Sequence, residues 1–174
     1  MNLSNLVHSS VGFVHLLFAV LAMITGTMVL AKTKGTSSHR KIGYAYCFCM
    51  LGLNISAFLI YRLFGKFGIF HWMAILSLVT ISAGMLPMIS KKAKHYIIWH
   101  YNFMYWSVIG LYAAFMAETL VRFPDVVIVD GVPNTVFYNA TGIASGIVMT
   151  IGVYFSIKKK KDWSKFDKTI QDTE

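Results

Sequence analysis

Apolar residues in this chain form five long runs that are separated by short polar segments. The runs cover residues 10–31, 42–64, 69–89, 96–120 and 136–157. A helix needs about 20 consecutive apolar residues to cross the hydrocarbon core of a bilayer, and each run reaches that length. The pattern therefore predicts an all-α integral membrane bundle of about five transmembrane helices.

Composition favours the same class of protein. Hydrophobic residues make up 56% of the 174 residues and charged residues only 13%, whereas soluble domains are about 45–50% apolar and about 25% charged. A soluble fold of this size cannot bury so much apolar surface, but a lipid bilayer can cover it. We expect a multi-pass protein of the cell membrane, the inner membrane in a bacterium. Residues 1–157 would form one helical domain in contact with membrane lipids.

The basic residues between the runs predict the orientation. Segments on one side receive thirteen of the sixteen Lys and Arg residues, and the other side has only Arg62, Lys66 and Arg122. Because cytoplasmic segments are enriched in Lys and Arg, the N-terminus is expected outside and the basic tail, residues 158–174, in the cytoplasm. Contact with anionic lipid headgroups then accounts for the formal net charge of +9, and nucleic acid is not expected as a partner.

Two smaller features concern the last connector and the last run. Residues 126–129 read VVIV within a loop that also carries Pro124 and Pro133, and we expect a short strand or an interfacial segment there. Gly142 and Gly146 have the four-residue spacing that allows close helix packing. We interpret this spacing as a contact within the bundle, with dimerisation as the alternative.

Six histidines are the most informative polar residues, because ionisable side chains inside a membrane are costly and mark functional sites. The predicted topology sorts them by depth. His15 and His71 lie near the outer ends of the first and third runs, whereas His39 and His100 lie at the cytoplasmic starts of the second and fourth. His95 and His100 do not share a helix face, so only one of them is expected to face the bundle.

Facing histidines at matching depth can hold a haem through two imidazole nitrogens. We therefore expect His15 and His71 to bind an outer haem b, and His39 and His100 an inner one. Electrons would then cross the bilayer to or from a quinone or another redox partner. This layout resembles the ascorbate-reducible diheme cytochrome b family and related four-helix membrane cytochromes, in arrangement and not in sequence. The main hypothesis is a b-type cytochrome that moves electrons through the membrane.

Two other functions compete with electron transfer. Glu118 is the one acid within a run, and with His15 and His71 it would supply three ligands of a catalytic zinc, as in an intramembrane hydrolase. His8 is a further candidate for that site. An ion pair with Arg122, four residues on, is the alternative role for Glu118. The third hypothesis is a non-catalytic accessory or transport protein without a cofactor, so enzymatic activity is not decided by the sequence.

Three segments together resemble domain-of-unknown-function family 2306, a family of small multi-pass bacterial membrane proteins. They are VHLLFAVLAMITG at 14–26, HRKIGYAY at 39–46 and WSVIGLYAAFMAE at 106–118. The family features fall on His15 and Gly26 in the first segment and on the HRxxGxxY pattern, His39 to Tyr46, in the second. The resemblance implies the fold and the membrane location, and it implies no activity.

Overall fold

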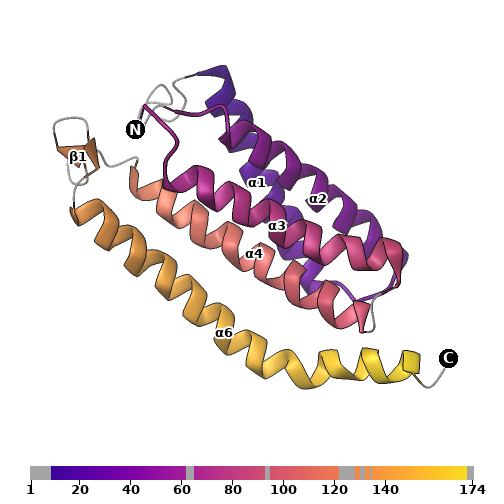
Figure 1. Cartoon of the computed structure of the whole chain (residues 1–174). Helices are drawn as coiled ribbons and strands as arrows, with labels where there is room; N and C mark the ends of the chain where they lie inside the picture. Colours follow the sequence, from indigo (N-terminus) through magenta and orange to yellow (C-terminus); the bar gives the residue numbers. More distant parts are fainter. Residues whose placement is uncertain are drawn as a thin grey trace.

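The computed structural model describes residues 9–61, 65–92, 95–121, 128–129, 132–133 and 135–171. This part of the chain contains five helices and one two-stranded hairpin (Figure 1). The elements are α1 (Ser10–Ala31), α2 (Ser37–Ala57), α3 (Ile69–Ser90), α4 (Tyr96–Val121), β1 (Ile128–Val129), β2 (Val132–Pro133) and α6 (Thr135–Gln171). The predicted all-α bundle is confirmed, and β1 confirms the short strand expected within VVIV.

The second helix is the one whose boundaries differ most from the sequence prediction. It begins at Ser37, because the Thr36 hydroxyl accepts a hydrogen bond of 3.2 Å from the His39 amide and caps the first turn. It ends at Ala57. The backbone hydrogen bonds that follow span three residues instead of four, as in the bond that the Leu59 amide donates to the Ser56 carbonyl. The predicted end at residue 64 is therefore wrong, since apolar residues continue into the connector. Residues 62–64 lie outside the described part.

Four of the described helices, α1, α3, α4 and α6, are long and apolar enough to cross a membrane. The fifth, α2, does not reach that apolarity because it carries Arg40, Lys41 and Asn54 among its residues. Asn54 is buried and its amide nitrogen donates to the Met50 carbonyl, 2.8 Å away. The orientation across the membrane, with the N-terminus outside, stays a prediction.

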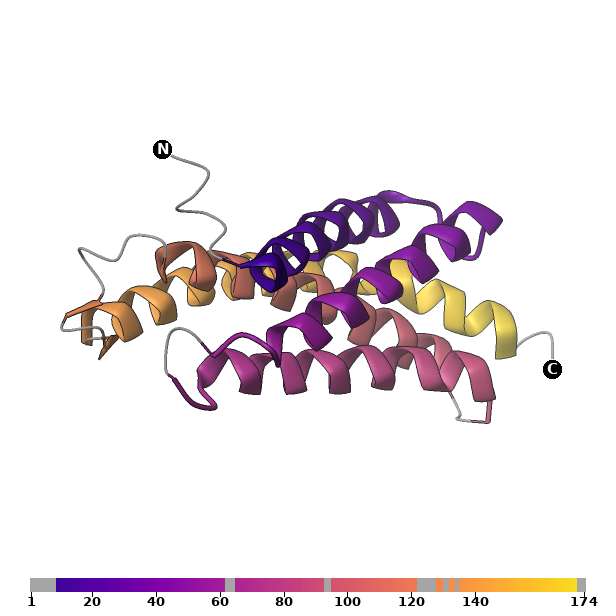
Figure 2. The ribbon, with the colours of Figure 1, turned by 90° about the horizontal axis from the view of Figure 1, so that it is seen from above.

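Consecutive helices run antiparallel, and α1 pairs with α2 as α3 pairs with α4. The last helix lies along α4, and its C-terminal part turns away from the bundle (Figure 1). Figure 2 shows the same bundle from above. The starts of α1 and α3 therefore meet the ends of α2 and α4, and we call this the Glu118 end. The opposite end, with the α1–α2 connector, is called the Lys34 end.

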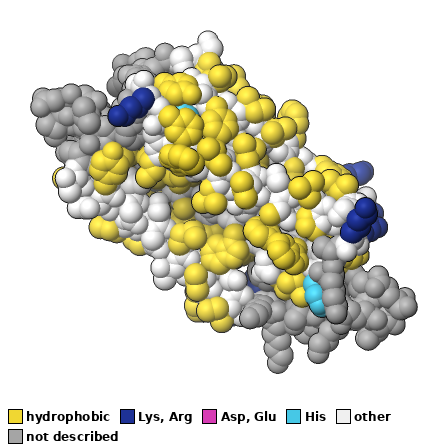
Figure 3. Space-filling model, viewed as in Figure 1, with side chains coloured by type: hydrophobic (Ala, Val, Ile, Leu, Met, Phe, Trp, Pro, Cys, Tyr) yellow, Lys and Arg dark blue, Asp and Glu magenta, His cyan; other side chains and the backbone are white. Residues whose placement is uncertain are grey.

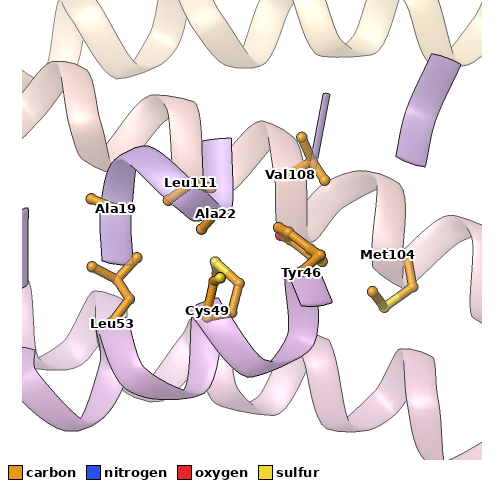
Figure 4. Close-up of a cluster of buried hydrophobic side chains, with 9 residues drawn as sticks. Ala19, Ala22, Tyr46, Cys49, Leu53, Met104, Val108 and Leu111 are labelled. Carbon is orange, nitrogen blue, oxygen red and sulfur yellow. The ribbon is translucent and has the colours of Figure 1, made fainter. Parts of the chain in front are cut away.

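The core of the bundle joins α1, α2 and α4 (Figure 4). Its buried members are Ala19, Ala22, Tyr46, Cys49, Met50, Leu53, Met104, Val108 and Leu111. Tyr46 is fully buried, and its hydroxyl lies 2.6 Å from the Ser107 hydroxyl, so the phenol is both packed and hydrogen-bonded. Buried polar groups that lack such a partner are destabilising.

Large apolar side chains cover much of the outer surface, and Figure 3 shows them spread over the helices on one face. Phe48, Trp72 and Leu76, for example, are each about two-thirds exposed. A water-soluble protein rarely leaves so continuous an apolar surface uncovered. Lipid chains are the natural cover for these side chains, as expected for a membrane protein.

Close packing of the last helix depends on Gly152 rather than on Gly142 and Gly146. A Cβ atom added at Gly152 would lie 2.7 Å from Ile109 Cγ2 and 3.3 Å from the Trp106 ring, both on α4. Added at Gly142 or Gly146, it would meet nothing within 4 Å. The interpretation of the GxxxG spacing as a bundle contact is therefore wrong, because these glycines are on a face of α6 without neighbours.

Replacing Gly152 with Leu is expected to destabilise the fold, because the added side chain must displace α4. Overpacking of this kind costs about 1–3 kcal/mol. The unfolding midpoint of the purified variant in detergent should fall accordingly. Gly142→Leu on the same helix is the matched control and should leave that midpoint near the wild-type value. Equal losses in both variants would show that α6 does not pack on α4 through Gly152.

Candidate functional site

The four histidines of interest lie at the two ends of the bundle. His15 and His71, near the starts of α1 and α3, are at the Glu118 end, and both are buried. His39 and His100, in the first turns of α2 and α4, are at the Lys34 end and are partly buried. The placement agrees with the expected grouping by depth, while the ligand roles of these residues stay predictions.

His15 has a protein partner at each ring nitrogen. Its Nδ1 lies 3.0 Å from the Ser56 hydroxyl, and that hydroxyl donates its own proton to the Leu53 carbonyl at 2.8 Å. His15 Nδ1 must therefore be the donor to Ser56, since a hydroxyl carries one proton. Its Nε2 lies 3.4 Å from Glu118 Oε2. Three helices, α1, α2 and α4, are joined through this one imidazole.

His71 caps its own helix. Its Nδ1 accepts a hydrogen bond of 3.1 Å from the amide of the N-cap residue Gly68, at the start of α3. Because Nδ1 is the acceptor, the proton of the neutral ring is on Nε2. That nitrogen is buried without a hydrogen-bond partner, and the rings of Tyr61 and Phe67 lie 4.6 and 4.7 Å from the imidazole, with interplanar angles of 33° and 29°. This tautomer has no lone pair left for a metal ion.

A zinc site at the Glu118 end needs three ligands, and the structure brings two of the expected residues together. His15 and Glu118 meet, but no group of three or more His, Cys, Asp or Glu side chains within the described residues could hold a metal ion. His71 is occupied by the Gly68 amide instead. The remaining candidate His8, and Arg122 as the alternative partner of Glu118, lie outside the described residues.

At the Lys34 end, His100 contacts the neighbouring helix. His100 Nδ1 lies 2.9 Å from the Gly84 carbonyl on α3. A carbonyl oxygen can only accept, so Nδ1 carries the proton and Nε2 keeps a lone pair. His95 precedes α4 with a positive φ of 60°, and its carbonyl accepts from the Trp99 amide at 3.2 Å. The rotation of α4 therefore turns the His100 ring toward α3 within the bundle.

His39 has a buried Nδ1 atom without a hydrogen-bond partner. Burial lowers the pKa of this ring below the usual value, and the charges of Lys34 and His100 lower it further, while the Val29 carbonyl acts in the opposite direction. The neutral ring is thus favoured, and His39 lies at the same end of the bundle as His100. Neutral imidazole is the form that binds metals.

Lys34 makes this end of the bundle positively charged. Its ammonium group donates to the carbonyls of Val29 and Leu30, both at 2.9 Å, in the last turn of α1. Burial and the charge of Lys159 on α6 lower the pKa of Lys34 to about 8. Among the residues whose side chains are described, the one acid is Glu118 at the opposite end. The basic groups here therefore have no carboxylate partner within that part of the chain.

Residues 12–157 match the model of DUF2306, a family described as a predicted membrane protein. The chain belongs to the DUF2306 family. No curated protein and no solved structure matches it. The matched residues include α1 to α4 and the apolar part of α6, so membership confirms both the resemblance seen in the sequence and a multi-pass membrane protein. The description of DUF2306 names no activity, cofactor or partner.

Proposed function

We propose that this DUF2306 protein is a membrane-embedded b-type cytochrome in which His39 and His100 bind one haem. The observation that supports the proposal is the hydrogen bond between His100 Nδ1 and the Gly84 carbonyl, 2.9 Å long. Histidines that bind metals usually donate their other ring proton to a backbone carbonyl or carboxylate, which fixes the tautomer and orients the ring. His100 already has this arrangement, with Nε2 as the atom left for iron.

His39 is the second residue that would hold the haem, for three reasons. Its Nδ1 is buried and has no hydrogen-bond partner among the described residues, and its lowered pKa favours the neutral ring. It also lies at the same end of the bundle as His100, near the start of α2 as His100 is near the start of α4. When bound, the haem would supply an iron that alternates between the ferric and ferrous states, with a potential set by these axial ligands.

The charge at the Lys34 end also fits a haem. Haem b carries two propionate groups, and a positively charged end without a described carboxylate partner offers them Lys34 and Lys159. A propionate would stabilise the half-buried ammonium group of Lys34 most, because an opposite charge nearby offsets the cost of burying the charged form. We further propose that the electrons pass to or from a quinone or another redox partner.

The proposal leaves out the second haem that the sequence pattern suggested. His15 uses one nitrogen for Ser56 and the other faces Glu118, while His71 uses Nδ1 as a helix cap. Either ring would have to break these contacts before it could bind iron. The same contacts give the zinc hydrolase no third ligand in the described chain.

An absorption spectrum of the purified protein, before and after dithionite, tests the proposal. We expect a Soret band that shifts on reduction, together with iron rather than zinc in a metal analysis. The protein should be produced in cells supplied with a haem precursor and purified in mild detergent. A colourless preparation that keeps its helix content under these conditions would refute the cytochrome.

A further inference from the structure

The contact between His15 and Glu118 has a consequence that does not depend on haem. His15 Nδ1 must hold a proton, because it donates to Ser56, whose hydroxyl donates to the Leu53 carbonyl. In the neutral ring, Nε2 is therefore a bare lone pair. That lone pair faces Glu118 Oε2 at 3.4 Å. An ionised carboxylate there would be a second acceptor, so the two atoms can face each other favourably only with a proton between them.

We propose that His15 and Glu118 form a proton-binding site at the Glu118 end of the bundle. One proton binds between His15 Nε2 and Glu118 Oε2 and is released from the same site. With the proton on nitrogen the pair is an imidazolium and a carboxylate, and with the proton on oxygen it is a neutral imidazole and a carboxylic acid. No other bond changes in either direction. Proton relays within membranes use His and acidic side chains in this way.

Exposure gives the site a route to its surroundings. The His15 side chain is 9% exposed and the Glu118 side chain 33%. The imidazole is thus held inside the bundle, while the carboxyl group has a free side through which a proton can be exchanged. Glu118 also lies within one turn of the end of α4 at Val121, near the membrane boundary. Water at that boundary is the source and the acceptor of the proton.

Other titratable residues described near this end of the bundle include His71, Tyr61 and Lys66. His71 on α3 bonds the Gly68 amide, Tyr61 stacks near His71, and Lys66 in the connector is exposed. The pair of His15 and Glu118 is the one ion pair found in this part of the chain. The arrangement is not that of a hydrolytic triad, because the Ser56 proton points to Leu53 and the hydroxyl is buried.

Dicyclohexylcarbodiimide added to native membranes can test for the proton. This apolar reagent reacts with a carboxyl group that is protonated and surrounded by lipid. The acid proton passes to a carbodiimide nitrogen and the carboxyl oxygen bonds the central carbon. The acyl group then moves to nitrogen, giving a stable adduct without a leaving group. Peptide mass mapping identifies the residue that is modified, and labelling is measured over a series of pH values.

In the wild-type protein, Glu118 is expected to be labelled to an extent that depends on pH. His15→Asn should move the pH of half-maximal labelling, because the carboxyl group no longer shares its proton with the ring. Ser56→Ala should also move the pH of half-maximal labelling, because its side chain no longer fixes the proton on His15 Nδ1. This variant replaces His15→Asn in the test if His15→Asn fails to reach the membrane. Glu118→Gln should abolish labelling at this position.

Thr119→Ala is the matched control, since the Thr119 hydroxyl bonds the Phe115 carbonyl of its own helix and not the pair. Its labelling profile should equal that of the wild type. Two results would overturn the proposal: Glu118 unlabelled at every pH at which the helices persist, or one profile shared by wild type, His15→Asn and Ser56→Ala. Neither result depends on whether the protein contains haem.

Discussion

Replacing His100 with Ala is expected to remove almost all bound haem while the helices remain. The substitution deletes the ring whose Nε2 is left free by the bond to Gly84. Even the loss of an outer-shell partner of a metal ligand typically lowers metal affinity about 10–100-fold, and the loss of the ligand itself should exceed that. The ratio of Soret absorbance to protein absorbance measures the effect, and circular dichroism checks the helix content.

His39→Ala is expected to have the same effect, because it removes the second axial nitrogen. His95→Ala and His71→Ala are the matched controls and should keep the wild-type haem content. In addition, His71→Ala removes a helix cap, so its free energy of unfolding should fall by about 0.5–2 kcal/mol. Loss of haem in His71→Ala with retention in His100→Ala would reverse our assignment of the site.

Replacing Gly26 with Leu is the change that we expect to damage the fold most. A Cβ atom at Gly26 would lie 3.0 Å from the Tyr46 ring and 3.2 Å from Val108 Cγ2. Tyr46 cannot easily move, because it is fully buried and bonded to Ser107. Overpacking a core costs about 1–3 kcal/mol, and a contact with two buried neighbours on two helices should reach the upper end.

The amount of folded monomer recovered in detergent, followed by size-exclusion chromatography, is the measurement for this prediction. Gly110→Leu on α4 is the control, since an added Cβ there has no neighbour within 4 Å. We expect the control to be recovered at wild-type yield and Gly26→Leu to be largely lost. Similar recovery of both variants would mean that the core around Tyr46 is looser than the structure indicates.

The helices could be predicted because lipid imposes a length on apolar runs. The limits of α1 agree with the prediction at both ends, Ser10 and Ala31. The end of α2 could not be found in this way, because apolar residues continue beyond Ala57 into the turns that close the helix. Apolar content shows what lipid can cover, but it does not show where hydrogen bonding of the helix stops.

The candidate site was only partly predictable from the sequence. It depends on which ring nitrogen of each histidine carries the proton, and on how α4 is rotated about its axis. Which of His95 and His100 faces the bundle depends on how α4 sits against α3, where Gly84 allows contact: an added Cβ would lie 2.9 Å from Met104 Sδ. Sequence periodicity does not contain that rotation. The tautomer of His71 depends on the Gly68 amide, although His71 at the third position after a glycine cap was a readable signal.

Ser56 is the hydrogen-bond partner of His15 that was not predicted from the sequence. It is a hydroxyl in the apolar segment LGLNISAF, and the short α1–α2 connector brings the end of α2 beside the start of α1. Counting back from that connector would have placed Ser56 at the depth of His15. The partner of His15 was therefore predictable in principle, whereas the direction of the Ser56 proton required the distance to the Leu53 carbonyl.

The number of haem groups per chain tests the central claim most directly. Haem can be quantified as its pyridine complex and divided by protein from amino-acid analysis, in preparations saturated with added haem. Because the proposal assigns iron to His39 and His100 alone, with His100 Nε2 left by the bond of Nδ1 to Gly84, we expect one haem per chain. A value of two would show that His15 and His71 also bind haem, and a value of zero in folded protein would contradict the cytochrome altogether.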